Sequence, residues 1–149
     1  MSGRSELNEE KQKQLDTLRQ GGIDIRYIQS DISKLDDVRN AFKTIKEEYG
    51  KLDGVIHSAG VIRDAFILKK RVEEIREVLS PKVMGALNLD EVVGGEELDF
   101  MVLFSSVAGV LGNIGQSDYA GANAFLDAFA AYRQGLVVEG KRFGKTVSI

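Results

Sequence analysis

Two polar residues of one predicted helix, Tyr119 and Asn123, are four positions apart, so their side chains share a face of that helix. A phenol with a pKa near about 10 is a poor acid at neutral pH, so a catalytic tyrosine needs a cation such as Lys82 to stabilise the phenolate. Ser106 ends the most apolar predicted strand and can donate a hydrogen bond to a carbonyl oxygen as negative charge develops. Together these residues predict a site that polarises and protonates a ketone. By spacing alone, a helical tyrosine is also open to a simple packing role in the core.

The elements that must position these residues follow from the spacing of apolar side chains. Stripes at three- and four-residue steps predict helices, whereas alternating or continuous apolar runs predict strands. Ser33 is the expected N-cap of the second helix, and Ser80-Pro81 is typical of an N-cap followed by proline in the first turn. Gly21-Gly22 and Gly50 are expected to end the first two helices. The predicted helices are 5–19, 33–49, 72–79, 80–92 and 117–133, and the predicted strands are 23–28, 52–57, 100–104 and 146–149.

Strands that alternate with amphipathic helices predict an α/β fold with a parallel sheet and right-handed crossovers. The run 100–104 contains no polar residue, as expected for a central strand covered by helices on both faces. The run 52–57 leads into Ser58-Ala59-Gly60. Such a loop at the carboxyl end of a strand is where α/β proteins bind ligands.

Composition narrows the possible functions. The 149 residues carry a net charge of −3 with acidic and basic residues interspersed, which argues against a nucleic-acid partner. There is no cysteine and a single histidine, His57, so we expect no metal site, assign His57 no catalytic role, and expect a reducing, cytoplasmic setting. No apolar run approaches the roughly 20 residues of a membrane span. The basic run 69–71 is open to two interpretations, a solvated helix start or a contact with an acidic carrier protein.

A known family resembles this chain over most of its length. The run from Asp99 to Asp127 reads DFMVLFSSVAGVLGNIGQSDYAGANAFLD and is similar to the signature of ketoreductase domains of modular polyketide synthases, a branch of the short-chain dehydrogenase/reductase superfamily. In that branch serine and tyrosine are thirteen residues apart and the tyrosine begins a Tyr-x-x-x-Asn motif, whereas ordinary short-chain dehydrogenases have Tyr-x-x-x-Lys. The resemblance implies that Ser106 polarises the carbonyl and that Tyr119 donates the proton. It also implies that Asn123 has a positioning role and that Lys82 is the cation that supports the tyrosine.

The resemblance also implies NADPH as the cofactor and names residues for it. Ala59 and Gly60 match the family's Ala-Gly pair beside the nicotinamide, and Asp31 matches an acidic residue near the adenine. Arg4 matches an arginine that contacts the 2′-phosphate of NADPH. The implied substrate is a β-ketoacyl chain attached through phosphopantetheine to an acyl carrier protein, among the other domains of a polyketide synthase.

One feature of the resemblance concerns stereochemistry. Asp64 matches the second Asp of the Leu-Asp-Asp signature of B-type ketoreductases, although Ile62 and Arg63 replace the first two letters. Leu111 stands where A-type enzymes have tryptophan. Both features imply the B-type course, which yields a D-configured β-hydroxyl group.

The chain departs from the family at its beginning. A dinucleotide site needs a first strand and a Gly-rich turn, so that the pyrophosphate meets N–H groups at a helix N-terminus. Gly21-Gly22 follows a predicted helix and cannot serve. We therefore expect residues 1–149 to be a partial ketoreductase domain cut from a larger multidomain protein, with a truncated Rossmann-like, doubly wound sheet. Without its central first strand the sheet should have two open edges, with reduced stability, rearrangement or self-association as the consequence.

Two other functions compete with this interpretation. A stand-alone short-chain dehydrogenase acting on a free carbonyl compound is the first, and the Lys82 and Asn123 arrangement argues against it. A non-catalytic structural piece is the second, since polyketide ketoreductases also carry a truncated structural half, which normally lacks the tyrosine and asparagine present here. Residues 1–149 by themselves are expected to be inactive, so reduction is assigned to the parent domain.

Overall fold

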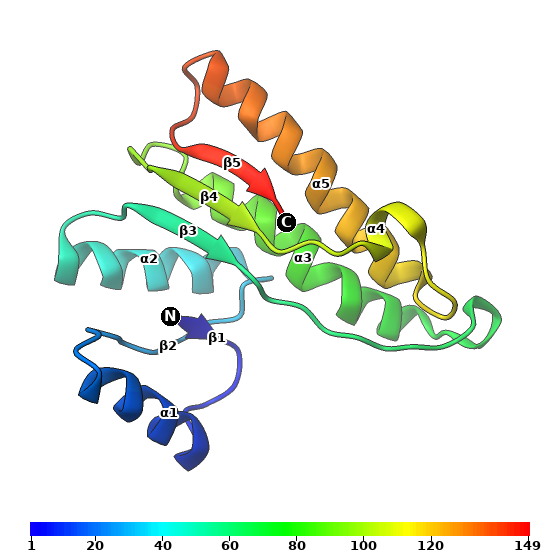
Figure 1. Ribbon diagram of the computed structural model, residues 1–149, viewed down its shortest axis with the longest axis horizontal. Coiled ribbons are helices and arrows are strands. Elements are labelled where there is room, and N and C mark those ends of the chain that lie inside the picture. The colour runs from blue at the N-terminus through cyan, green and yellow to red at the C-terminus, as the bar shows by residue number, and fades with distance from the viewer.

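The computed structural model describes all 149 residues and has the alternating α/β order that the sequence predicts (Figure 1). No helix combines the length and apolar character needed to cross a membrane. The elements in chain order are β1 (Ser2–Gly3), α1 (Glu9–Gln20), β2 (Ile28–Gln29), α2 (Leu35–Tyr49), β3 (Gly54–His57), the 3-10 turn η1 (Ile67–Lys69), α3 (Val72–Val92), β4 (Phe100–Leu103), α4 (Ala108–Leu111), α5 (Ser117–Val138) and β5 (Lys145–Ser148).

The strands form two separate parallel sheets. β1 pairs with β2, and β4 lies between β3 and β5 in a three-stranded sheet whose register sets Met101 beside Val55 and Thr146. The parallel α/β class is thus confirmed, whereas the sheet is divided. No segment of the chain runs between β1 and β3, so their facing edges have no strand to join them.

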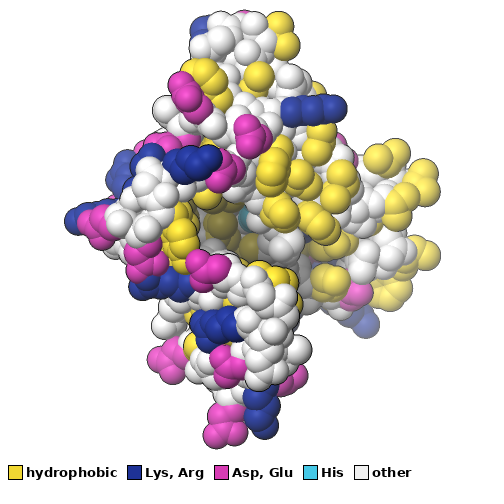
Figure 2. All heavy atoms as spheres, turned by 60° about the vertical axis from the view of Figure 1, so that its left-hand side comes forward, with side chains coloured by type: hydrophobic (Ala, Val, Ile, Leu, Met, Phe, Trp, Pro, Cys, Tyr) yellow, Lys and Arg dark blue, Asp and Glu magenta, His cyan; other side chains and the backbone are white.

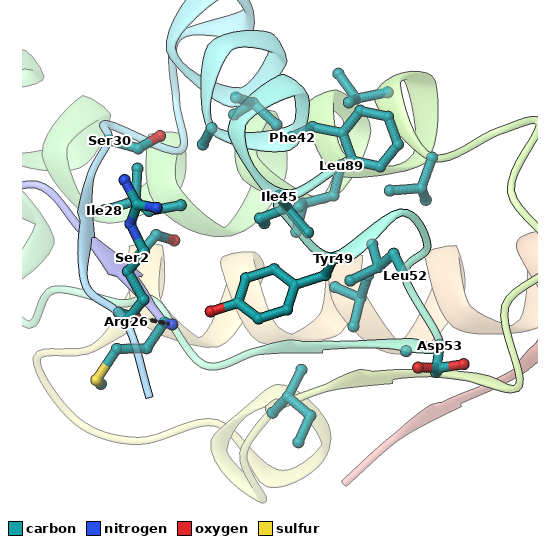
Figure 3. Close-up of a pocket in the computed structure, with 18 of the residues that line it drawn as sticks. Ser2, Arg26, Ile28, Ser30, Phe42, Ile45, Tyr49, Leu52, Asp53 and Leu89 are labelled. Atoms are coloured by element: carbon teal, nitrogen blue, oxygen red, sulfur yellow. Dashed lines mark hydrogen bonds between the residues drawn. The ribbon is translucent and has the colours of Figure 1, made fainter. Parts of the chain in front are cut away.

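The space between these two edges is an apolar cavity of about 540 Å³. β1 and β3 form two of its sides and α2 closes a third, with α3 behind them (Figure 3). Tyr49 of α2 reaches across the opening toward Ser2 and Arg26, while Ile45 and Leu89 lie deeper. The cavity lies where the sequence analysis expected the central strand to be missing.

The main core belongs to the three-stranded sheet, and it lies on one face. Burial alternates along β4: Met101 and Leu103 are buried against α3 and α5, whereas Phe100 is exposed and Val102 is half-buried on the other face. The expectation that helices cover both faces is therefore wrong for this chain. The buried cluster consists of Ala86, Met101, Leu103, Leu126, Phe129 and Ala130.

One predicted helix boundary is wrong in a way that affects the site. Ser80-Pro81 does not start a helix, because α3 continues through it from Val72 to Val92. Proline removes one helical hydrogen bond, but Val78, Lys82 and Ala86 form a buried stripe on a single face of α3 and hold both halves in line. Lys82 is consequently fixed in the middle of a long helix instead of in its first turn.

Smaller differences occur in the first fifty residues. The predicted strand 23–28 is reduced to Ile28–Gln29, because β1 offers only two residues to pair with. Lys34 rather than Ser33 precedes α2, since the backbone N–H and hydroxyl of Ser33 both donate to the Asp31 carboxylate. The first helix begins after Asn8, whose side chain caps it, rather than near Ser5. Gly21 and Gly50 end α1 and α2 as predicted.

Candidate active site

The four residues predicted to bind the cofactor, Arg4, Asp31, Ala59 and Gly60, line one cavity of about 710 Å³. They come from three different places: the end of β1, the loop after β2 and the loop after β3. The cavity thus lies at the carboxyl ends of strands from both sheets, which brings together residues more than fifty positions apart. Most of the residues that line this cavity are polar, whereas hydrophobic side chains gather in and around the hollow near the centre of the face that Figure 2 shows.

The polar wall of this cavity keeps Asp31 ionised. Partial burial favours the protonated acid, but the hydrogen bonds from Ser33 and the positive charges of Lys34 and Arg4 outweigh it. The pKa of Asp31 is consequently lowered below its ordinary value. The cavity lining thus contains an ionised carboxylate, Asp31, and a cation, Arg4, whose positive charge favours the ionised form.

Lys82 and Tyr119 lie close together and are not part of the lining of this cavity. The Lys82 ammonium lies 5.7 Å from the centre of the Tyr119 ring and donates a 2.7 Å hydrogen bond to the backbone carbonyl of Phe104. Burial lowers the pKa of Lys82, and the negative charge of Asp127 opposes that shift. A Cβ atom on Gly60 would lie 3.2 Å from Cε of Lys82, so the glycine lets the cavity wall approach the lysine closely. The cation therefore lies close both to Gly60 in the cavity wall and to the Tyr119 ring.

Ser106 and Asn123 lie where α4 packs on α5. The Ser106 hydroxyl accepts a hydrogen bond from the Ala108 N–H, which leaves its own proton free to donate. Nδ2 of Asn123 donates to the Tyr119 carbonyl, while its Oδ1 is buried without a partner. A Cβ atom on Gly109 would lie 2.9 Å from the backbone nitrogen of Ala124, so only glycine permits this contact between the helices. Asn123 therefore holds the first turn of α5, which carries Tyr119.

His57 lies beneath the site at the end of β3. It is buried, and neither ring nitrogen has a hydrogen-bond partner. Burial, aided by the positive charge of Lys82, lowers the pKa of His57 to about 4. The imidazole is therefore neutral at physiological pH and adds no second cation beside Lys82.

The sequence analysis missed three residues that make polar contacts around the start of α5: Gln116, Asp118 and Lys70. Gln116 donates to both carboxylate oxygens of Asp64, and Asp118 forms an ion pair with Lys70 that is shielded from solvent. Neither earlier interpretation of the basic run 69–71 holds for Lys70, whose side chain is fully buried. The available signal was the acidic residue directly before the tyrosine, but nothing in local spacing links positions 70 and 118. Leu111, at the end of α4, is exposed.

Known proteins with similar sequences identify the family of this chain. The family model described as "KR domain" matches residues 1–143. The chain is 49% identical over its whole length to "Polyketide synthase PksL" and 44% identical to "Polyketide synthase PksN", both from Bacillus subtilis (strain 168), and it spans 3% of the length of each. The whole proteins are thus far larger than the region compared.

Solved structures agree with the sequence relatives. A ketoreductase domain from the bacillaene assembly line superimposes with a TM-score of 0.96 at 50% identity, covering 99% of this chain and 35% of the other. An N-terminal ketoreductase from the macrolactin assembly line has a TM-score of 0.92 at 45% identity, covering 99% of this chain and 30% of the other. A short-chain dehydrogenase from Mycobacterium avium, at 22% identity and a TM-score of 0.80 over 87% of this chain and 48% of the other, shares the Rossmann-like fold. Sequence and structure together show that the chain belongs to the KR domain family, the ketoreductase domains of polyketide synthases.

Proposed function

We propose that this chain forms the catalytic part of a cytoplasmic, NADPH-dependent β-ketoacyl reductase domain. The substrate is a β-ketoacyl thioester on an acyl carrier protein, and the product is the β-hydroxyacyl thioester. The observation that carries the proposal is the buried Lys82, with its Nζ 5.7 Å from the centre of the Tyr119 ring, close to Gly60 of the cavity that Arg4 and Asp31 also line. The activity is proposed for the complete domain and not for residues 1–149 alone.

Each polar residue has a distinct task in this proposal. Tyr119 protonates the ketone oxygen, and the Ser106 hydroxyl donates a hydrogen bond to the same oxygen. The positive charge of Lys82 favours the Tyr119 phenolate that remains after the proton has been donated. Asn123 keeps Tyr119 in place through the hydrogen bond to its carbonyl.

The residues that the resemblance assigns to NADPH all line the large cavity. Arg4 would hold the 2′-phosphate, Asp31 would lie near the adenosine, and Ala59 and Gly60 would face the nicotinamide. The absence of a side chain at Gly60 supports this assignment, because a Cβ there would press on Lys82. When bound, NADPH supplies the hydride for the β-carbon.

The proposed stereochemical course is B-type. Asp64 is held by Gln116, three residues before Tyr119, so the carboxylate stands near the start of α5. Leu111 leaves the end of α4 without the tryptophan that the family uses for the opposite course. The expected product has a D-configured β-hydroxyl group.

The decisive test is Tyr119→Phe in the complete ketoreductase domain. We expect turnover of a β-ketoacyl thioester, followed by loss of NADPH absorbance, to fall by at least about 100-fold, because the proton donor is gone. NADPH binding, followed by nicotinamide fluorescence, should be unchanged. Tyr132→Phe is the matched control, since Tyr132 lies exposed on the same helix. Unaltered turnover in Tyr119→Phe would refute the assigned role.

A further inference from the structure

The loop between β3 and α3 is fastened to the residues just before Tyr119. Three bridges cross this boundary. The Ala65 N–H donates to the Gly115 carbonyl at 3.0 Å. Nε2 of Gln116 lies 3.0 and 3.1 Å from the two oxygens of Asp64, and Nζ of Lys70 lies 2.7 Å from both oxygens of Asp118. The loop that carries Asp64 is thus attached at three points to the start of α5.

Apolar packing does not hold this loop. It has no strand or α-helix, and its large hydrophobic side chains face solvent, with Leu68 97% exposed and Phe66 and Ile67 also exposed. A surface segment whose large hydrophobic side chains are exposed is free to move unless polar contacts restrain it. The position of Asp64 relative to Tyr119 therefore depends on the bridges.

The Lys70–Asp118 pair is the strongest of the three bridges. The side chains are 0% and 2% exposed, whereas Gln116 and Asp64 meet in an exposed contact. A buried pair is shielded from water and salt, and removal of one partner leaves a charge that nothing solvates. Lys70 also donates to the Arg63 carbonyl, next to Asp64, and Asp118 accepts from the backbone N–H of Tyr119. The two charges thus connect the neighbours of both functional residues.

We propose that Lys70 and Asp118 are positioning residues that set the Asp64 loop over Tyr119 and thereby determine which epimer of the β-hydroxyl group is made. This inference rests on the proposed reductase function. Neither residue touches the reacting atoms: Asp118 orients the backbone of Tyr119, and Lys70 holds the loop. Loss of the pair frees the loop, so the ketone can present either face to the hydride.

The test uses Lys70→Met in the complete ketoreductase domain, with Lys69→Met as the control because Lys69 is the exposed neighbour. We expect Lys70→Met to lower kcat about tenfold, to erode the ratio of the two product epimers about tenfold, and to leave the Kd for NADPH unchanged. The double variant Lys70→Met/Asp118→Asn leaves no unpaired charge and keeps the test valid if the single variant does not fold. The double variant should also show the eroded epimer ratio, whereas a merely stabilising pair would shift Tm and leave the ratio unchanged.

A second measurement does not depend on activity. The Ala65 amide, which reports the loop contact directly, should exchange its hydrogen at least tenfold faster in the double variant and normally in Lys69→Met. Unchanged exchange of the Ala65 amide would show that the Lys70–Asp118 pair does not hold the loop, whether or not the domain reduces ketones. Faster exchange with an unchanged epimer ratio overturns the stereochemical role. A wild-type domain that reduces nothing refutes the proposed function, and with it the stereochemical role, while Ala65 exchange still decides whether the pair holds the loop.

Discussion

The two-stranded sheet with α1 forms the first half of the molecule, and the three-stranded sheet with α3 and α5 forms the second half. Both halves contain parallel strands joined by helices, yet they are held together differently. In the first half β1 and β2 have two residues each, and Leu15 is the single buried residue of α1. In the second half the four-residue strand β4 packs on α3 and α5 through the cluster that contains Met101 and Leu126. Buried apolar area stabilises in proportion to its extent, so the second half is the rigid one.

The site divides along the same line. Lys82, Ser106, Tyr119 and Asn123 all belong to the second half, whereas Arg4 and Asp31 belong to the first. The apolar cavity of about 540 Å³ separates the two sheets. The chemistry proposed here is thus carried by the tightly packed half, and cofactor recognition is shared with the loosely packed one.

The largest loss of stability is expected from a buried charge in the second half. Asp90 of α3 accepts hydrogen bonds from Arg133 at 2.7 Å and Arg142 at 3.0 Å, and Arg133 is completely buried. Asp90→Ala leaves the Arg133 guanidinium without a counter-charge and should lower the free energy of unfolding by about 3–5 kcal/mol. Denaturant unfolding of the complete domain measures this change.

The matched control for Asp90 is the neighbouring exposed ion pair between α2 and α3. Arg39 and Glu91 are 2.7 Å apart, and both side chains are 55% exposed. Arg39→Ala should change the free energy of unfolding by at most about 1 kcal/mol. Similar losses in the two variants would contradict the claim that burial of Arg133 is what makes the loss of Asp90 costly.

An intermediate effect is expected where the halves meet. His57 packs close to Gly85 of α3 and to Ile32, and its pKa of about 4 in the folded protein is below the ordinary value of 6.5. The unfolded chain therefore binds a proton that the folded chain excludes, so stability present above about pH 6.5 is lost as the pH falls toward 4. Between pH 7 and pH 5 this loss amounts to about 2 kcal/mol.

His57→Leu removes this titration, and the comparison of unfolding free energies at the two pH values measures it. Carboxyl groups titrate in both proteins, so the difference between the two pH dependences is the relevant quantity. The variant should lose about 2 kcal/mol less than the wild type on acidification. Parallel curves would show that His57 is not held neutral in the folded protein.

The smallest effect is expected in the first half. The Tyr27 hydroxyl donates to the Gly3 and Ser5 carbonyls and so fastens the end of β1 to the segment that leads into β2. Tyr27→Phe should cost about 1 kcal/mol. The loss should appear as faster exchange of the Ser30 amide, which donates to Gly3, while amides of β4 stay protected. Faster exchange in β4 as well would mean that the two halves unfold together.

Much of the fold followed from the sequence because its signals are local. The apolar stripe of α2, the run 100–104 and the terminating glycines Gly21 and Gly50 each depend on residues within one or two turns. The wrong boundary at Ser80-Pro81 has the same origin, since the local signal of a helix start was overridden by burial of Val78 and Ala86 along one face. The sequence also predicted wrongly that helices cover both faces of β4. Which faces are covered depends on where the helices of the rest of the chain pack.

The sequence by itself determined the α/β order and the family and singled out Ser106, Tyr119, Asn123 and Lys82 as candidate site residues, because propensity, apolar period and motif spacing are all local properties. The place of Lys82 in the middle of α3 came from the tertiary structure. Tertiary structure alone decided that the strands form two sheets and that Lys70 is buried against Asp118, 48 residues away. Hydrogen bonds between strands and the desolvation of a charge depend on which distant segments are brought together. Those contacts are properties of the folded chain, so no local pattern encodes them.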